Sequence, residues 1–405
     1  MPEAVIVSAV RSPIGRAFKG SLTTIRPDEL AVQIVRAALE KVPALSVGDI
    51  EDLLLGCGLP GGEQGFNLGR LIAVGLGYDT LPATTVNRFC SSSLQTTRMA
   101  AHAIRSGDGE VYLSAGVETV SRLAPNPPDS DPATHNPRYA AAEARTARRV
   151  EHSDEWTDPR EAGELPDFYI EMGQTAENVA VAHDVSREDM DAYSARSQNL
   201  AEAASDSGYW QREITPVILP DGAIVSHDDG PRRGTTVEVL AGLKPAFRPD
   251  GRVTAGNACP LNDGAAALVV MSDAKAAALG LVPLARVVST AVTGLSPEIM
   301  GMGPVEASRK ALRNAGLTIA DIDLVEINEA FASQVLASAR ELDIDIDKLN
   351  VNGGAIAIGH PFGMTGARIT ATLIHALSER DQTFGLETMC VGGGQGMAMV
   401  IERLS

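Results

Sequence analysis

Two cysteines and one histidine stand in sequence contexts that could support nucleophilic and acid–base chemistry. Cys90 lies between an apolar run and three serines in VNRFCSSSLQ, His360 lies in the Gly-rich segment NVNGGAIAIGHPFGMTGARI, and Cys390 precedes three glycines in ETMCVGGGQGM. A thiol can attack a carbonyl carbon, an imidazole can accept the thiol proton, and backbone N–H groups beside glycines can stabilise an oxyanion. Core packing is the alternative for each cysteine, because free cysteines are among the most buried residue types.

The surroundings of Cys90 predict a strand, a turn and a helix. ATTVN before it is typical of a strand end, and SSSLQTTRMAAHAIRSG after it has helical spacing that stops at Gly107, with Leu94, Ala101 and Ile104 on one face. Cys90 would then lie at a helix N-terminus, where unpaired N–H groups and the helix dipole favour the thiolate and lower the thiol pKa. Both a nucleophilic and a packing role stay open for Cys90 on this evidence.

The other polar candidates are weaker when each is taken alone. Asn328 in VEINEAFASQV follows an apolar strand and precedes a helix, which fits an N-cap or a polar site residue, and the N-cap is the simpler interpretation. We expect solvent-exposed or structural roles for the histidines other than His360, because they fall in helical patterns or in a loop-rich segment. These residues are His102, His135, His152, His183, His227 and His375.

These residues belong to an α/β pattern that occurs twice. AVIVSAVRSPIG predicts a buried strand and a turn, and DELAVQIVRAALEK predicts an amphipathic helix. Residues 38–57, ALEKVPALSVGDIEDLLLGC, resemble residues 311–330, ALRNAGLTIADIDLVEINEA, and residues 107–121 resemble residues 380–394 at a similar offset. Two related α/β halves are therefore expected, with chance similarity between α/β units as the alternative.

The segment between the two halves has a different amino-acid composition. Residues 123–170 are rich in Pro and charged residues, which is typical of an excursion over the surface. TAENVAVAHDVSREDMDAYSARSQNLAEAA then predicts helix, and TAGNACPLNDGAAALVVMS returns to a Gly-rich loop and an apolar strand. We predict an N-terminal half at 1–122 plus 251–280, an inserted loop lobe at 123–250, and a C-terminal half at 281–405.

Composition excludes several classes of protein. A chain of 405 residues with 44% hydrophobic residues can bury a large core, and it has no run of about 18 apolar residues that would predict a membrane span. The first residues lack the pattern of a secretory signal, so the cytoplasm is the expected location.

Four scattered cysteines predict neither a disulfide framework nor a zinc site. The net charge of -18 argues against a nucleic-acid partner, although local arginines could still bind a small anion.

Four segments taken together resemble the thiolase family over essentially the whole chain. They are VNRFCSSSLQ, INEAFA, NGGAIAIGHPFGMTGAR and CVGGGQG, in this order, and TAENVA, LKPAF, TAGNA, NDGAAA and MGMGPV match the family as well. The resemblance implies an α/β fold of thiolase type, with two similar halves in a five-layered α-β-α-β-α arrangement and an inserted loop lobe that helps to bind coenzyme A. It also implies that CoA is a substrate, that no metal or redox cofactor is needed, and that the protein is a homodimer or homotetramer.

The same resemblance implies a role for each candidate residue. Cys90 would be the nucleophile that becomes acylated, His360 would activate it, and Cys390 would be the acid and base that moves protons at the α-carbon and at the CoA thiol. Asn328 would hold a water that, with His360, stabilises the enolate oxygen. The N–H groups of Cys90 and Gly392 would form a second oxyanion hole. The residues expected to contact substrate or CoA are Met172, Ala258, Cys259, Phe331 and Met364.

Three positions depart from the family pattern. Cys259 stands where the family often has Ser, and we expect one weaker hydrogen bond along the pantetheine arm of CoA. Glu171 stands where several members have His, and Met364 stands where Ala or Cys is usual. These two residues would reshape the acyl pocket, with ordinary sequence drift as the alternative.

The expected activity is that of an acyltransferase, the thiolytic cleavage of 3-ketoacyl-CoA by CoA through an acyl-cysteine, as in fatty acid β-oxidation. One alternative is an acetyl-CoA acetyltransferase that is specific for acetoacetyl-CoA and works in the condensing direction, and another is a non-catalytic protein that binds CoA or lipid. A decarboxylating ketoacyl synthase shares the fold, but Cys390 and Asn328 favour a thiolase. VNRFCSS favours the broad-range degradative members. Fatty, branched and sterol-derived acyl groups all stay open.

Overall fold

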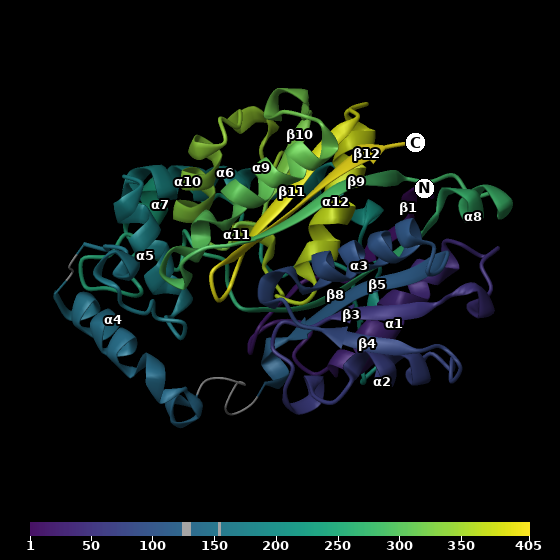
Figure 1. The fold of residues 1–405 in the computed structure, drawn as a ribbon, viewed down its shortest axis with the longest axis horizontal. Helices are drawn as coiled ribbons and strands as arrows, with labels where there is room; N and C mark the ends of the chain where they lie inside the picture. The colour runs from purple at the N-terminus through teal and green to yellow at the C-terminus, as the bar shows by residue number, and fades with distance from the viewer. Residues whose placement is uncertain (124–130, 153–154) are drawn as a thin grey trace.

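A large mixed sheet forms the centre of the molecule in the computed structural model, which describes residues 1–123, 131–152 and 155–405. Its strands run in the order β10-β11-β12-β9-β1-β8-β5-β3-β4, and β1 pairs with β9 at two positions only, so two half-sheets meet at a short seam (Figure 1). The strands on this path are β1 (Ala4–Arg11), β3 (Asp52–Gly56), β4 (Ala83–Val86), β5 (Val111–Thr119), β8 (Asn262–Ser272), β9 (Ala285–Gly294), β10 (Leu324–Ile327), β11 (Phe384–Val391) and β12 (Gln395–Arg403).

The two half-sheets repeat one topology. The order β4-β3-β5-β8-β1 in the N-terminal half matches β10-β11-β12-β9 in the C-terminal half, where Leu349 forms a parallel bridge to Val325 at the place that β4 takes in the other half. A capping box also precedes each corresponding strand, at Ser46 before β3 and at Thr318 before β10. The predicted pair of related α/β halves is therefore confirmed.

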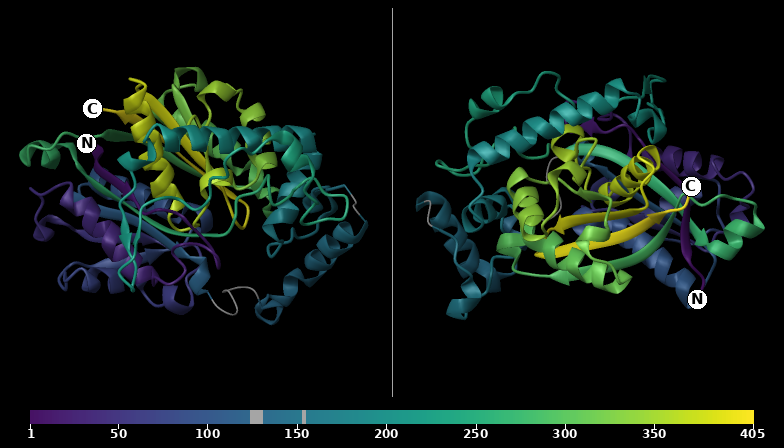
Figure 2. Two further views of the ribbon diagram at one scale, coloured as in Figure 1. Left: turned by 180° about the vertical axis from the view of Figure 1, so that it is seen from behind. Right: turned by 90° about the horizontal axis from the view of Figure 1, so that it is seen from above.

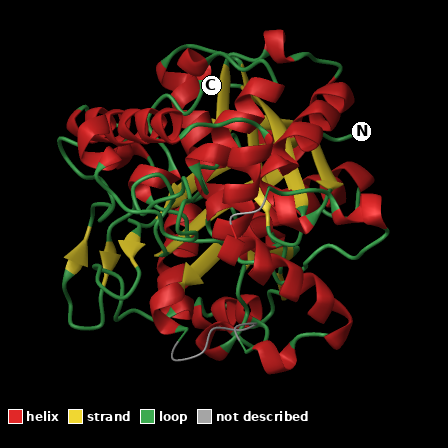
Figure 3. Cartoon of the chain, turned by 90° about the vertical axis from the view of Figure 1, so that its left-hand side faces the viewer, coloured by secondary structure: helices red, strands yellow, loops and turns green. Residues whose placement is uncertain are grey.

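Helices cover both outer faces of the half-sheets and fill the space between them (Figures 1 and 3). The helices α3 and α12 contact one another in the centre, α1 and α2 pack on the N-terminal half-sheet, and α9 packs on the C-terminal one. This is the predicted five-layered arrangement. The helices of the two halves are α1 (Pro27–Glu40), α2 (Leu68–Gly75), α3 (Ser92–Ser106), α8 (Asp273–Ala278), α9 (Gly303–Ala315), α10 (Ala332–Glu341), α11 (Ala355–Ile358) and α12 (Thr365–Glu379).

The central helices approach each other closely because a glycine lies at their contact. A Cβ atom at Gly366 would lie 2.2 Å from the backbone nitrogen of Leu94, so no other residue fits there without moving α3. The N–H of Ala367 donates to Ser93 Oγ at 2.9 Å, which links the two helix N-termini. The two halves are thereby joined directly behind the catalytic candidates on the 3-10 turn η3 (Phe89–Ser91) and in the loop before α12.

The lobe between the halves is mainly helical, and residues 124–130 and 153–154 of the predicted lobe lie outside the described residues. The single helical segment predicted after residue 174 is in fact two helices, because Asp184 adopts a left-handed φ of 48° and the side chain of Ser186 accepts from the N–H of Asp189 to begin a new helix. The long second helix, α6, runs along one side of the molecule (Figure 2). The lobe helices are α4 (Ala140–His152), α5 (Met172–Ala182), α6 (Arg187–Asp206) and α7 (Val237–Ala241).

Part of this chain segment returns to the core. Tyr209 and Trp210 belong to the central apolar cluster, and the side chain of Val217 packs in the core of the N-terminal half. A short hairpin of β6 (Val217–Ile218) and β7 (Ile224–Val225) follows.

The predicted domain boundaries stay a prediction. Among the helices in the described ranges, none combines the length and the apolar character that a membrane crossing requires.

Candidate active site

Cys90 lies on a sharp turn between a strand and a helix, as predicted. The 3-10 turn η3 (Phe89–Ser91) follows β4, and α3 begins at Ser92. Phe89 has a φ of 44°, a left-handed conformation that an aromatic residue adopts only when the surrounding structure enforces it. This backbone conformation, immediately before Cys90, brings the half-buried cysteine out at the end of the half-sheet.

The expected low pKa of Cys90 is wrong for the substrate-free protein. Burial of the thiol raises its pKa to about 12, while hydrogen bonds from the N–H groups of Gly392 and of Cys90 itself act in the opposite direction. Desolvation of the charged thiolate therefore outweighs the local backbone dipoles that the sequence suggested. Cys90 is a neutral thiol at pH 7, and it needs a base when it attacks.

The end of β11 and the turn after it bring a second thiol and one backbone donor to Cys90. Cys390 lies on β11 and is fully buried, and burial together with Cys90 and Cys259 raises its pKa well above the ordinary value. The N–H of Gly392, two residues further on, bonds to the Cys90 thiol. A Cβ atom at Gly392 would lie 3.3 Å from the ring of Phe89, so the turn lies directly against the chain around Cys90. The structure thus gathers three thiols and two backbone donors.

His360 lies in a loop whose backbone only glycine can form. Gly359 has a φ of 111°, and a Cβ atom there would lie 2.5 Å from the amide of Asn262. That amide accepts a 3.0 Å hydrogen bond from the N–H of His360 and donates to the carbonyl of Gly15 at 3.0 Å. The loop with His360 is therefore tied to the N-terminal half.

A threonine fixes the tautomer of His360. Thr365 Oγ1 donates its proton to the carbonyl of Pro361 at 2.7 Å, so its contact of 2.6 Å with Nδ1 of His360 requires Nδ1 to be the donor. Nε2 then carries the lone pair and can accept a proton. Burial, and to a lesser extent Arg368, lowers the pKa of His360 to about 3, so the imidazole is neutral at physiological pH.

Asn328 faces His360 and caps no helix. Its Nδ2 lies 3.2 Å from Nε2 of His360, and the next helix, α10, has Phe331 as its N-cap. The N-cap interpretation is therefore wrong. The Oδ1 atom of Asn328 is buried without a hydrogen-bond partner among the described residues. An unpaired buried acceptor is costly, so a water or a substrate atom that donates to Oδ1 would fit here.

The predicted substrate contacts separate into two groups. Cys259 and Ala258 lie beside the chain after Asn328, because the N–H of Cys259 donates to the carbonyl of Ala330 at 3.0 Å and Ala258 forms a bridge to Phe331. Met172 begins α5 and, like Ala258, packs against the apolar core of the C-terminal half. Met364, by contrast, is fully buried in the central cluster, with its sulfur against Gly264. Glu171 is exposed at the N-cap of α5.

A groove runs from the lobe to Ala258, one of the predicted substrate contacts. Ala258 forms part of its wall, apolar side chains of α7 and the following loop form another part, and two arginines add positive charge to an acidic protein. Such a combination suits a ligand with an apolar arm and phosphate groups. Its lining residues are Arg16, Gln198, Gly230, Arg232, Thr235, Val239, Leu240, Leu243, Ala255, Gly256, Ala258, Pro260 and Ile356.

Two buried carboxylates hold the loops around His360 and Asn328, and sequence reasoning assigned a role to neither. Glu118 on β5 accepts from the N–H groups of Gly58 and Gly363, each at 2.8 Å, so it joins a loop of the N-terminal half to the loop with His360. Glu329 accepts from Tyr193 at 2.8 Å and from the N–H of Ile356 at 3.0 Å, so it joins α6 to α11. The sequence did contain a signal for Glu118, because it is a charged residue in SAGVET, a strand of otherwise small or apolar residues.

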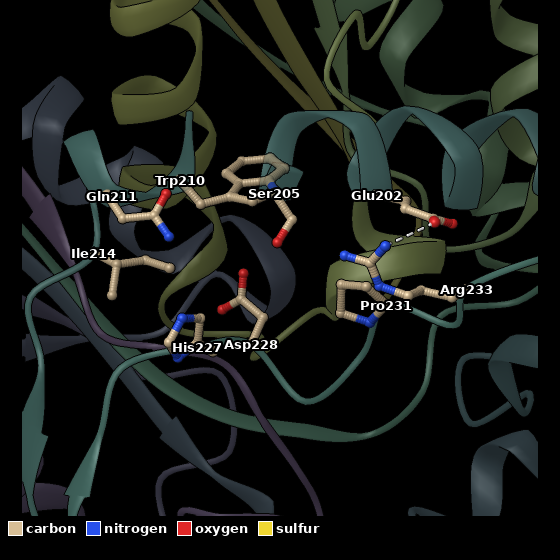
Figure 4. Close-up of a pocket in the computed structure, with 9 residues that line it drawn as sticks. All are labelled: Glu202, Ser205, Trp210, Gln211, Ile214, His227, Asp228, Pro231 and Arg233. Carbon is tan, nitrogen blue, oxygen red and sulfur yellow. Dashed lines mark hydrogen bonds and ion pairs between the residues drawn. The ribbon is translucent and has the colours of Figure 1, made fainter. Parts of the chain in front are cut away.

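A second hollow lies beside the C-terminal end of α6 (Figure 4). Its charged residues pair with protein groups, because Arg233 bonds to Glu202 at 3.2 Å and Asp228 accepts from the buried Arg11 at 2.7 Å. These ion pairs fix the chain on either side of Arg232, which lines the groove. The residues around it are Glu202, Ser205, Trp210, Gln211, Ile214, His227, Asp228, Pro231 and Arg233.

Comparison with known proteins places this site in a family. Residues 4–274 match the family described as thiolase, N-terminal domain, and residues 281–403 match thiolase, C-terminal domain. The chain is 45% identical to the 3-ketoacyl-CoA thiolase of Bacillus subtilis over 99% of its length and all of that protein, and 45% identical to the acetyl-CoA acetyltransferase of Pseudomonas aeruginosa over the full length of both. The crystal structure of the Bacillus anthracis acetyl-CoA acetyltransferase matches with a TM-score of 0.87 at 42% identity, covering 100% of this chain and 99% of that one. The chain therefore belongs to the thiolase family of acyltransferases.

Proposed function

We propose that this protein cleaves 3-ketoacyl-CoA with CoA, giving acetyl-CoA and an acyl-CoA two carbons shorter. The observation that carries the proposal is the hydrogen bond from the Gly392 N–H to the Cys90 thiol. It sets the nucleophile against a turn that can bind an oxyanion, with Cys390 two residues before that donor. A protein that only binds CoA or lipid would not need two neighbouring thiols beside such a turn.

The first half of the reaction acylates Cys90. His360 Nε2 accepts the thiol proton while sulfur attacks the ketone carbon, and the N–H groups of Cys90 and Gly392 hold the resulting oxyanion. The bond between the α-carbon and the former ketone carbon then breaks, and the electron pair leaves as the enolate of acetyl-CoA. A water on Asn328 and His360 stabilises the enolate oxygen, and Cys390 donates its proton to the α-carbon.

The second half transfers the acyl group to CoA. Cys390, now a thiolate, takes the proton from the thiol of an incoming CoA, whose sulfur attacks the acyl-Cys90 thioester. The same two N–H groups bind the second oxyanion, and the Cys90 sulfur leaves and regains a proton from His360. The proton that each residue releases returns to it within one cycle, so the proposed mechanism needs neither a metal nor a redox cofactor.

The groove beside Ala258 is the proposed CoA site. Arg16 and Arg232 would pair with phosphate groups, and Leu240 and Leu243 would contact the pantetheine arm. Cys259 and Met172, near the inner end, would contact the arm close to the thioester. A cysteine at 259 is a weaker hydrogen-bond donor than a serine hydroxyl, so the expected cost is in CoA binding and not in the chemistry.

An acetyltransferase that condenses two acetyl-CoA molecules is the second candidate. The P. aeruginosa relative carries that name and is as similar to this chain as the B. subtilis thiolase. The same groups serve both directions, because each step above is reversible. The range of accepted acyl chains separates the two candidates.

The test is CoA-dependent thiolysis of 3-ketoacyl-CoAs from four to sixteen carbons, with Cys90→Ala as the blank. Activity on chains beyond four carbons supports the degradative function. Activity confined to acetoacetyl-CoA would establish the acetyltransferase instead. If folded wild-type protein cleaves none of these substrates, the proposed function is wrong.

We also propose a homodimer, or a tetramer built from two dimers, in the cytoplasm. The support for an interface is the edge strand β4, whose outer side has no partner strand among the described residues, together with the exposed side chains of Leu71 and Val74 on the neighbouring α2. An unpaired strand edge flanked by apolar side chains is a place where a second copy can add its own edge. Light scattering of the purified protein measures the oligomeric state directly.

A further inference from the structure

One aromatic side chain in the lobe is exposed although its neighbours hold it firmly. Phe168 is 41% exposed, whereas Asp167 before it is buried. The N–H of Asp167 donates to Glu298 at 2.9 Å, and Asp167 Oδ1 accepts from the N–H of Tyr169 at 3.0 Å. A large apolar ring that is kept in place yet left open to solvent has the properties of a ligand contact.

Glu298 is the anchor of this part of the lobe. Its carboxylate is fully buried and accepts from Arg145 at 2.9 Å, from Arg149 at 3.2 Å and from Trp156 Nε1 at 2.8 Å, in addition to the Asp167 N–H. Arg145 also bonds to Glu164 at 2.8 Å, so the charge of both arginines is taken up by carboxylates of the chain. The backbone that carries Phe168 is fixed by the same carboxylate.

Further rings extend the surface that Phe168 begins. His135 stacks on Tyr169 with ring centroids 3.8 Å apart, and Tyr139 meets Tyr169 edge to face at 5.7 Å. Phe168 meets Tyr169 edge to face at 5.4 Å and lies 6.2 Å from Tyr139. We call these four residues the aromatic wall. Its edge-to-face contacts are those that aromatic rings prefer, so the wall is a packed unit and not four independent side chains.

The aromatic wall reaches the reacting groups at the turn after Cys390. A Cβ atom at Gly393 would lie 3.0 Å from the ring of Phe168 and 3.5 Å from the ring of Phe89. Phe89 directly precedes the nucleophile, and Gly392 supplies the N–H that bonds to it. Two phenyl rings thus stand at the oxyanion-binding turn, one from the turn with Cys90 and one from the lobe.

We propose that Phe89 and the aromatic wall bind the acyl group of the substrate and select neutral acyl groups that end in an aromatic ring. This inference rests on the thiolysis proposed above and adds the class of substrate. A terminal ring can make edge-to-face contacts with Phe168 and Tyr139. A terminal carboxylate would lose its hydration beside these rings, and Arg145 and Arg149 are already paired with Glu298.

The test compares kcat/KM for four substrates: acetoacetyl-CoA, 3-oxooctanoyl-CoA, 3-oxoadipyl-CoA and 3-oxo-5-phenylpentanoyl-CoA. We expect the phenyl substrate to exceed 3-oxooctanoyl-CoA and to exceed 3-oxoadipyl-CoA by about tenfold or more, equivalent to about 1.4 kcal/mol. A preference for 3-oxoadipyl-CoA would overturn the inference and would point to Arg88, whose guanidinium donates to the neutral side chains of Gln95 and Gln395, as the group that binds the carboxylate.

Variants separate substrate selection from folding and catalysis. Phe168→Ala should lower kcat/KM for the phenyl substrate about tenfold, a clearly larger factor than its loss on acetoacetyl-CoA. Phe168→Arg should raise the activity on 3-oxoadipyl-CoA relative to the phenyl substrate. Phe18→Ala is the matched control, because Phe18 is 61% exposed and lies outside the aromatic wall. An equal loss on all substrates in Phe168→Ala would contradict the inference, and a wild type that cleaves none of the four would contradict the proposed function itself.

Discussion

Thr365 Oγ1 lies 2.6 Å from Nδ1 of His360 and 2.7 Å from the carbonyl oxygen of Pro361. The hydroxyl has one proton, and the carbonyl can only accept, so the imidazole must donate from Nδ1. Thr365, the first residue of α12, thereby decides which nitrogen of His360 carries the lone pair. The residue is five positions after the histidine and belongs to the same motif.

Thr365→Val should lower kcat for thiolysis about 10- to 100-fold, the range typical of residues that orient a catalytic ligand. The shape of the side chain is kept while the acceptor for Nδ1 is lost, so the imidazole can change its tautomer. KM should change little. Thr365→Ser keeps the hydroxyl and is the control. If Ser and Val variants lose activity equally, the hydroxyl does not set the tautomer.

Alkylation of Cys90 should report its raised pKa. Because burial raises the thiol pKa to about 12, the thiolate fraction and the rate of reaction with iodoacetamide should rise about tenfold per pH unit from about pH 6 to pH 9. Peptide mass mapping assigns the label to Cys90, and Cys390→Ala removes the neighbouring thiol as a competitor. A rate that reaches a plateau below pH 8 would contradict the prediction and indicate a preformed thiolate–imidazolium pair.

Glu326 should make the protein less stable at high pH. Burial raises its pKa from 4.5 to about 8, so the folded protein keeps a proton that the unfolded chain has lost above about pH 4.5. This stabilisation is full below that pH and is lost as the pH rises through about 8. Glu326→Gln, which mimics the protonated carboxyl, should already exceed the wild-type Tm by a few degrees at pH 6 and should exceed it by more at pH 9.

The exposed Glu306 gives a control for that measurement, because Glu306→Gln removes one carboxylate that pairs only at the surface with Arg309. Its Tm should follow the wild type at both pH values. A large loss of stability in Glu326→Gln at pH 6 would show that Glu326 is ionised and bound to a buried cation.

Glu298→Ala should loosen the lobe and leave the chemistry in place. Arg149 is buried and would lose its carboxylate partner, a change that typically costs about 3–5 kcal/mol. Trypsin should then cut within residues 131–170 sooner than in the wild type, while acetoacetyl-CoA thiolysis falls by less than about threefold. Unchanged proteolysis in the variant would mean that other contacts hold this segment.

Local sequence was sufficient for the features that depend on local structure. Gly107 ends α3 in a left-handed conformation, as its position after a helical pattern predicted, and the capping boxes at Ser46 and Thr318 mark the two related halves. The motif around Cys90 predicted a turn between a strand and a helix, and the motif around His360 predicted a Gly-rich turn before a helix; the structure confirms both. Their assigned roles stay predictions.

Features that depend on distant contacts could not be predicted in this way. The pKa of Cys90 is set by burial under other parts of the chain, whereas the sequence indicated only the helix dipole. The carboxylate of Glu118 bonds to Gly363, 245 positions away, and Glu298 holds side chains from α4 that lie about 150 positions earlier. No local pattern signals such partners. Asp184 breaks the predicted long helix by adopting a left-handed conformation that its residue type permits without requiring it.

The most direct test of the central claim is the intact mass of the protein after brief incubation with 3-oxohexanoyl-CoA in the absence of free CoA. The account predicts the release of acetyl-CoA and a mass increase equal to one butanoyl group, located on Cys90 by peptide mapping, lost on addition of CoA and absent from Cys90→Ala. An unmodified wild-type protein that nevertheless cleaves the substrate, or a butanoyl adduct that persists in Cys90→Ala, would contradict it.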